Sequence, residues 1–199
     1  MPRNIEPRLP PRERLLLAAE TLFCQDGILR VTVDAIAEKA GSTKMTLYRH
    51  FASKEVLVME WIKLLTEDYA AIFNDLQARF PDQPIQQIMG FVQFITDNVN
   101  ATLHRGCPFT NTLAEAGEHF PDVRTIIVEH KQRQFHRLET LCQQSGAAEP
   151  ESLAKEITLL LEGVQIVAQN TGFSDAATFT ATCIEQRLMN LNSSQDKPR

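Results

Sequence analysis

The sequence predicts an all-α protein of about nine helices, and three observations support this prediction. Apolar residues recur at every third or fourth position along most of the chain, which is the period of a helix with one buried face. Glycine and proline residues interrupt this pattern and mark the ends of helices. No stretch reads convincingly as a strand, and we find no internal repeat.

The N-terminal segment should be a flexible arm followed by a helix. Residues 1–11 contain four prolines, which keep them out of a helix. The first helix is predicted from Pro11 to Gln25, and Gly27 ends it. Its apolar face consists of Leu15, Leu16, Ala19, Leu22 and Phe23.

A compact pattern of two short helices follows the first helix. Thr32 can cap a helix over residues 33–40, and Gly41 ends it because a residue just past a helix often needs a positive φ. A second short helix occupies residues 44–50. Two helices joined by such a turn form a helix-turn-helix unit, whose second helix enters the major groove of DNA. Residues 12–55 are therefore predicted to be a three-helix DNA-binding domain.

The residues expected to contact DNA surround this second helix. Its first residues should face the base edges and the backbone, and its last residues should lie beside phosphates. Lys54 starts the next helix, where free N–H groups also favour phosphate. The predicted contacts are Thr32, Thr43, Lys44, Met45, Thr46, Tyr48, Arg49, His50 and Lys54. For Lys44 and Arg49 the alternative is a solvated surface, and for Tyr48 it is a core aromatic.

The charge distribution favours DNA binding by the N-terminal part. The net charge is −5, but residues 1–54 carry nine Lys and Arg against six Asp and Glu, and the remainder carries eleven against nineteen. The basic part should hold the phosphate contacts. Arg3 and Arg8 would let the arm reach the minor groove or phosphates, although an exposed tail without contacts is the alternative.

These residues together resemble the tetracycline-repressor (TetR) family of bacterial regulators. The resemblance covers about the first quarter of the chain. It is carried by Leu22, Phe23, Gly27, Thr32, Ile36, Ala37, Ala40, Gly41, Thr46, Leu47, Tyr48, Phe51, Ser53, Lys54, Glu55 and Leu57. It implies a regulator, more commonly a repressor, that binds an inverted-repeat operator on double-stranded DNA as a homodimer. Met45 replaces a smaller residue and offers an apolar surface, for example to a thymine methyl group.

Residues 56–191 are predicted to form a C-terminal helical domain for dimerisation and ligand binding, followed by a disordered tail over residues 192–199. Periodicity and prolines place the helices at 54–79, 84–102, 109–118, 122–144, 150–170 and 174–191, the last capped by Ser174. The helix at 150–170 is apolar around more of its circumference than one core needs. It and the last helix should therefore form a four-helix dimer interface.

The resemblance also implies a small-molecule effector, of unknown identity, that releases the protein from DNA. Its pocket is expected between the helices at 54–79 and 150–170, because pockets commonly lie between helices of a bundle. Candidate lining residues are Trp61, Phe94, Cys107, Asn111 and Glu115. For each of them ordinary core or surface placement is the alternative.

Other classes of protein have weaker support. The sequence holds no phosphate loop and no motif of a serine hydrolase or zinc protease, so we expect no catalysis and no cofactor. The four cysteines lack metal-ligand spacing, and reduced, mostly buried thiols are expected, with a redox switch or ligation by His104 and Cys107 as alternatives. Without a signal peptide or a long apolar run, a cytoplasmic protein that does not enter a membrane is expected. A helical adaptor for protein partners remains the rival class.

Overall fold

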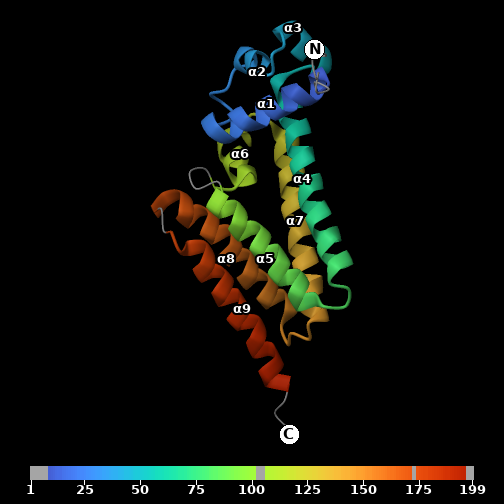
Figure 1. Ribbon diagram of the computed structural model, residues 1–199, viewed down its shortest axis with the longest axis vertical. Coiled ribbons are helices and arrows are strands. Elements are labelled where there is room, and N and C mark those ends of the chain that lie inside the picture. The colour runs from blue at the N-terminus through green and yellow to red at the C-terminus, as the bar shows by residue number, and fades with distance from the viewer. Residues whose placement is uncertain (1–8, 102–105, 172–173, 196–199) are drawn as a thin grey trace, which may run out of the picture. The chain divides into compact units, whose positions relative to one another are not determined.

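The computed structural model describes residues 9–101, 106–171 and 174–195. Within these residues all regular secondary structure is helical, which confirms the predicted all-α class. The helices of this part are α1 (Pro11–Asp26), α2 (Val33–Lys39), α3 (Lys44–His50), α4 (Lys54–Arg79), α5 (Pro84–Ala101), α6 (Pro108–Ala116), α7 (Pro121–Gln144), α8 (Pro150–Thr171) and α9 (Ala176–Gln195) (Figure 1). Residues 1–8 of the predicted arm lie outside the described residues. Residues 192–195 of the predicted disordered tail continue α9, so the prediction is wrong for them, and residues 196–199 lie outside the described residues.

The chain folds into two compact units, each built from segments that are distant in sequence. Unit 1 comprises the described residues up to Leu65 together with residues 108–127. Unit 2 comprises residues 66–107 and the described residues from Val128 onward. From sequence, residues 56–65 and 108–127 were expected in the C-terminal domain, whereas their contacts in the structure lie within unit 1.

Unit 1 has a small apolar core between α1, α2 and α3. Leu15 of α1, Ile36 of α2 and Leu47 of α3 are fully buried, and Phe51 joins them directly after α3. These residues recur at helical spacing, so each helix turns one apolar stripe inward. Closing the core fixes the position of α3, whose opposite face stays in solvent.

Unit 2 is a helical bundle in which α5, α8 and α9 pack against one another (Figure 1). Val99, Val164 and Ala177 lie in a buried cluster between them. Further along α5, the ring of Phe91 stacks on Phe73 of α4 with centroids 4.4 Å apart. Aromatic stacking of this kind adds to the burial of both rings.

Three helix boundaries differ from the sequence prediction by two residues or more, namely the end of α6 and both ends of α9. Helix α6 spans Pro108–Ala116 and not 109–118, because the amides of His119 and Phe120 bond to the carbonyl of Ala116 and turn the chain. Helix α9 begins at Ala176 and continues to Gln195. The carbonyl of Asp175, and not that of Ser174, accepts a hydrogen bond from the amide of Phe179 at 2.8 Å and starts the helix.

Among the described residues, no helix combines the length and the apolar composition that a membrane-spanning helix needs.

Candidate nucleic-acid interface

Two threonines begin the short helices of unit 1. The Oγ1 of Thr32 accepts a hydrogen bond from the amide of Ala35 at 3.2 Å, and the Oγ1 of Thr43 accepts one from the amide of Thr46 at 3.1 Å. Each threonine has an extended backbone and satisfies an amide that the helix leaves free. The hydroxyl groups of Thr43 and Thr46 also lie 3.0 Å apart. The start of α3 is therefore held by its own side chains.

The turn between α2 and α3 depends on Gly41. Its φ is 55°, in the left-handed region that glycine reaches without steric cost. The amide of Gly41 bonds to the carbonyl of Glu38, and the amide of Ser42 bonds to that of Ala37. These bonds close the end of α2 and reverse the chain into α3, as predicted for a helix-turn-helix unit.

The face of α3 opposite the core presents apolar, aromatic and basic groups to solvent. Met45 is 84% exposed and Tyr48 is 46% exposed. Arg49 and His50 are exposed at the end of the same helix. A methionine on an open surface loses its apolar contacts unless a partner covers it. Tyr48 is therefore not a core aromatic, since nearly half of it faces solvent.

Lys44 is held by an ion pair that the sequence did not predict. Its Nζ lies 2.9 Å from the Oδ2 of Asp34 in α2, and both side chains are exposed. The hydrogen bond to Asp34 and the charge of that carboxylate raise the pKa of Lys44. Asp34 and Lys44 are ten residues apart, so no helical spacing pairs them in the sequence. The packing of α2 on α3 brings them together.

Lys54 begins α4 in a partly buried position. The Oγ of Ser53 accepts a hydrogen bond from the amide of Val56 at 3.1 Å, so Ser53 caps this helix. Burial lowers the pKa of Lys54 below its ordinary value, and the nearby charge of Glu115 partly offsets this effect. The side chain therefore has less freedom to reach DNA than Lys44 or Arg49.

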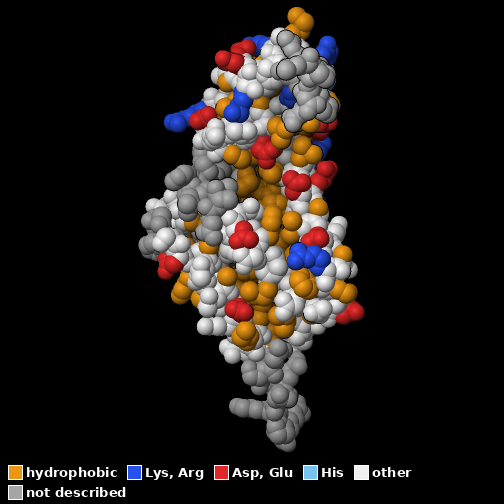
Figure 2. All heavy atoms as spheres, in the orientation of Figure 1, with side chains coloured by type: hydrophobic (Ala, Val, Ile, Leu, Met, Phe, Trp, Pro, Cys, Tyr) orange, Lys and Arg blue, Asp and Glu red, His pale blue; other side chains and the backbone are white. Residues whose placement is uncertain are grey.

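Figure 2 shows Lys and Arg side chains on the surface of the head, which is the part of unit 1 formed by α1, α2 and α3, with acidic side chains between them.

One further arginine packs on the core of this head. The guanidinium of Arg12 lies 5.3 Å from the centroid of the Phe51 ring and pairs with Glu60 at 2.5 Å. Arg3 and Arg8, which were predicted to accompany the head, lie outside the described residues.

The five residues predicted to line an effector pocket fall into both units. Trp61 is 3% exposed and packs on Phe23 in unit 1, with ring centroids 5.3 Å apart. Asn111 and Glu115 are half-buried on α6 of the same unit. Phe94 and Cys107 belong to unit 2. The structure thus does not bring all five together within one unit.

Phe94 and Cys107 accompany a group of buried polar side chains in unit 2. The rings of Phe94 and His130 meet the Tyr69 ring edge to face, at centroid distances of 5.1 and 5.3 Å. Burial, with the charges of Cys107 and Glu162, raises the pKa of Tyr69 well above its ordinary value. The Sγ of Cys107 lies 3.8 Å from the Nζ of Lys131.

Gln134 adds a further polar group to the interior of unit 2. It is 7% exposed, and its Oε1 has no hydrogen-bond partner among the residues that the structure describes. A buried carbonyl oxygen without a partner is unfavourable unless another molecule donates to it. The amide oxygen of Gln134 is therefore an acceptor that no described residue uses.

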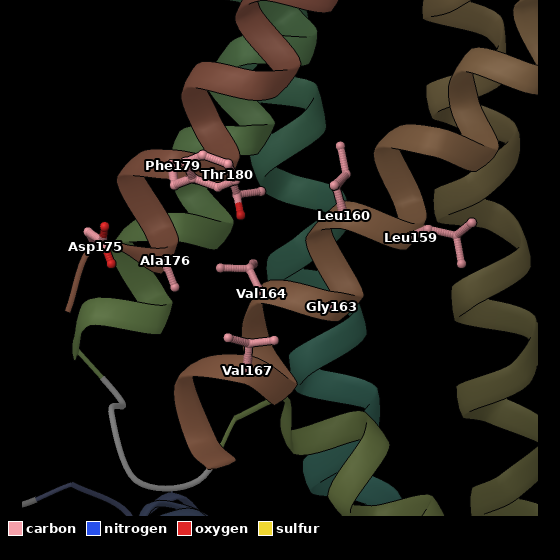
Figure 3. A pocket seen from close by; sticks show the side chains of 9 residues that line it. All are labelled: Leu159, Leu160, Gly163, Val164, Val167, Asp175, Ala176, Phe179 and Thr180. Atoms are coloured by element: carbon pink, nitrogen blue, oxygen red, sulfur yellow. The ribbon is translucent and has the colours of Figure 1, made fainter. Parts of the chain in front are cut away.

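A groove of about 600 Å³ lies between α8 and α9 (Figure 3). Apolar side chains line most of it, and 73% of Leu159 and 68% of Phe179 are exposed. Its lining residues are Leu159, Leu160, Gly163, Val164, Val167, Asp175, Ala176, Phe179 and Thr180. None of the five predicted effector residues lies in this groove.

Across the described residues, no group of His, Cys, Asp and Glu could hold a metal ion, and His104 lies outside them.

The sequence of the chain matches family models in both of its parts. Residues 15–60 match the model of bacterial regulatory proteins of the tetR family, and residues 84–184 match the model of the tetracyclin repressor-like C-terminal domain. The second match alone covers more than half of the chain.

Relatives and solved structures agree with these matches. The chain is 28% identical over 122 residues to the HTH-type transcriptional regulator TtgR of Pseudomonas putida, which is 57% of this chain and 58% of that protein. It is also 28% identical over 133 residues to the HTH-type transcriptional repressor NicS of Pseudomonas putida, covering 58% of this chain and 61% of that protein. The matched stretches thus span less than two thirds of these relatives.

A TetR-family transcriptional regulator from Streptomyces coelicolor has the same fold. It superimposes with a TM-score of 0.82 at 24% identity, over 91% of this chain and 95% of that chain. This likeness concerns the fold, and the family models carry the assignment. The capped helix-turn-helix unit, the helical bundle and both matches lead to one conclusion: the chain belongs to the tetR family of bacterial regulatory proteins.

Proposed function

We propose that this protein is a transcriptional regulator that binds an inverted-repeat operator as a homodimer and leaves it when a small molecule binds. The observation that carries the proposal is the exposed face of α3, where Met45 is 84% exposed on a helix capped by Thr43. A short helix with one buried and one open face is suited to enter the major groove. Repression is favoured because the relative NicS is named a repressor.

The DNA contacts divide by position along α3. Thr43, Lys44, Met45 and Thr46 begin the helix, where a recognition helix meets base edges and the DNA backbone, with Lys44 on a phosphate. Tyr48, Arg49 and His50 follow and would contact phosphates. Thr32 and Lys54 complete the set at the starts of α2 and α4, where helix N-termini attract phosphate oxygens.

The homodimer would form through α8 and α9. The apolar groove between these helices is open, and Leu159 and Phe179 project from it (Figure 3). Exposed apolar surface of this kind marks an interface, and a second copy would cover both sides by the same contacts. Two copies would then present two α3 helices to successive half-sites of the operator.

The effector site is proposed in the interior of unit 2, beside Phe94 and Cys107. The Tyr69 ring contacts the rings of Phe94 and His130, and Gln134 follows His130 by about one turn of α7 with a buried amide oxygen. An aromatic molecule that carries a hydrogen-bond donor would satisfy the Oε1 of Gln134 and stack on the rings. Trp61 lies in unit 1 against Phe23, so its fluorescence would report on the head and not directly on this site.

Selection of genomic DNA tests the main proposal. The purified chain is incubated with sheared DNA from its source organism, and retained fragments are sequenced and titrated at several salt concentrations. We expect fragments that share an inverted repeat, bound by a dimer in sedimentation, with affinity that falls steeply as salt rises. A monomer, or a chain that retains no fragment, contradicts the proposal and favours an adaptor for protein partners.

A further inference from the structure

In unit 1, a carboxylate from α6 packs directly on the glycine that ends α1. Gly27 has a φ of 84°, and its amide bonds to the carbonyl of Phe23. A Cβ atom at Gly27 would lie 2.5 and 2.6 Å from the two carboxylate oxygens of Glu115. At these distances a side chain at Gly27 would push the Glu115 carboxylate away from its present position. The positive φ favours glycine here, and the carboxylate occupies the space that a Cβ would take.

The Glu115 carboxylate interacts with two further residues of unit 1. It accepts the amide of Leu29, in the turn between α1 and α2, at 3.4 Å. Its charge also favours the protonated form of Lys54 at the start of α4. The carboxylate thus contacts the turn that leads into α2 and acts on Lys54 through its charge.

Glu115 lies on the helix with which the chain passes from unit 2 back into unit 1. Helix α6 has nine residues, about 13 Å in length, and Glu115 lies in its last turn. The first residue of α6, Pro108, follows directly on Cys107, which belongs to unit 2. One end of α6 is therefore covalently joined to unit 2, while its other end contacts the turn that precedes α2.

We propose that Glu115 is a positioning residue for DNA binding, which holds the turn at Gly27–Leu29 so that α2 and α3 keep their DNA-binding arrangement. This role rests on the proposed function. Glu115 would not touch DNA. It would fix the turn from which α2 starts, and Asp34 of α2 in turn pairs with Lys44 of α3.

Substitution of Glu115 should lower the affinity for DNA, whereas removal of a negative charge alone should raise it or leave it unchanged. Loss of a carboxylate elsewhere on the protein strengthens binding to phosphates or leaves it unchanged. Glu115→Gln should instead weaken binding to a genomic fragment retained by the wild-type chain by at least about fivefold. Glu118→Gln is the matched control, because Glu118 is exposed three residues further on and its substitution changes the net charge equally.

A double-mutant cycle tests whether Gly27 and Glu115 act through one contact. Gly27→Ala strains the backbone and displaces the carboxylate, and Glu115→Ala removes the carboxylate. In Gly27→Ala/Glu115→Ala the loss of the carboxylate contact is therefore counted once and not twice. The loss of DNA affinity in the double variant should therefore be smaller than the product of the two single losses. Circular dichroism of each variant checks that the helices persist, and hydrogen exchange at the Leu29 amide should become faster in Glu115→Gln.

The outcomes separate this role from the proposed function. If the wild-type chain binds DNA and Glu115→Gln binds as Glu118→Gln does, the positioning role is wrong and the regulator assignment stands. Independent losses in the double-mutant cycle would likewise overturn it. A loss of helical structure in Glu115→Gln that accounts for the weaker binding would show an ordinary structural role. A wild-type chain that retains no DNA would overturn both.

Discussion

Lys44 of α3 and Asp34 of α2 form an ion pair of 2.9 Å on the surface that is expected to face DNA. The pair joins the two helices of the helix-turn-helix unit through their side chains. It also places a carboxylate beside a cation that would otherwise be free to bind phosphate. Binding of DNA must therefore compete with Asp34 for the ammonium group.

Asp34→Asn should release Lys44 to DNA. We expect tighter binding to any fragment at low salt, and a logarithmic salt dependence steeper by about one phosphate contact. Fluorescence anisotropy titrations at several salt concentrations measure both quantities. Glu38→Gln is the control, since it removes one exposed charge from the same helix without freeing Lys44. Equal salt slopes in the two variants would show that Lys44 does not reach phosphate.

Met45→Ala should change the base preference of the protein with little effect on its salt dependence. The side chain is exposed and uncharged, so it can meet base edges or thymine methyl groups but releases no counterions. A titration against a set of operator variants, each with one substituted base pair, measures this preference. An unchanged ranking of these operators would remove Met45 from the predicted base contacts. Arg49→Ala provides the contrast, because it should weaken all operators alike.

Phe179→Asp should dissociate the dimer. The phenyl ring is 68% exposed beside the groove between α8 and α9, and a carboxylate there would be buried without a partner if a second copy covered it. Sedimentation velocity should show a shift from dimer to monomer, with loss of operator binding. Thr178→Asp adds the same charge at the neighbouring exposed position and should leave the dimer intact. Dimers in both variants would place the interface elsewhere.

Stability should depend on pH through His130. Burial and the charges of Lys131 and Arg133 lower the pKa of His130 to about 4, whereas an unfolded histidine titrates near 6.5. A depressed histidine pKa means that the unfolded state binds the proton first, so the stabilisation by neutral His130 is complete above about pH 6.5 and is lost as the pH falls toward 4.

Urea unfolding at a series of pH values between 7.5 and 4 measures this effect. His130→Gln should flatten the decline of the unfolding free energy over this interval, because the variant has no imidazole to protonate. His119→Gln is the control, since His119 is exposed in unit 1. A decline that is identical in wild type and His130→Gln would assign the pH dependence to other groups.

Cys142 should resist alkylation in the folded protein. It is fully buried, and burial raises the pKa of its thiol to about 11, so at pH 8 only about one molecule in a thousand carries the reactive thiolate. Cys24 is exposed and should react with iodoacetamide first. Mass spectrometry of the modified peptides follows both positions over time. Rapid modification of Cys142 under native conditions would show that α7 opens more readily than its packing implies.

Local sequence determined the helices and the helix-turn-helix unit. Thr32, Thr43 and Ser53 cap helices by accepting hydrogen bonds from amides three residues away, and Gly41 supplies the positive φ of the turn. Such interactions lie within a few residues of each other, so the spacing of residue types is enough to predict them. The core residues Leu15 and Leu47 follow from helical periodicity for the same reason.

Tertiary structure decided which polar groups meet. Glu115 and Gly27 are 88 positions apart, and nothing in either local pattern indicates that the carboxylate packs on the glycine. Trp61 and Phe94 were predicted to share a pocket, yet one lies in the core of unit 1 and the other in unit 2. Helical periodicity says which face of a helix is buried, but the partner buried against that face depends on how the whole chain packs.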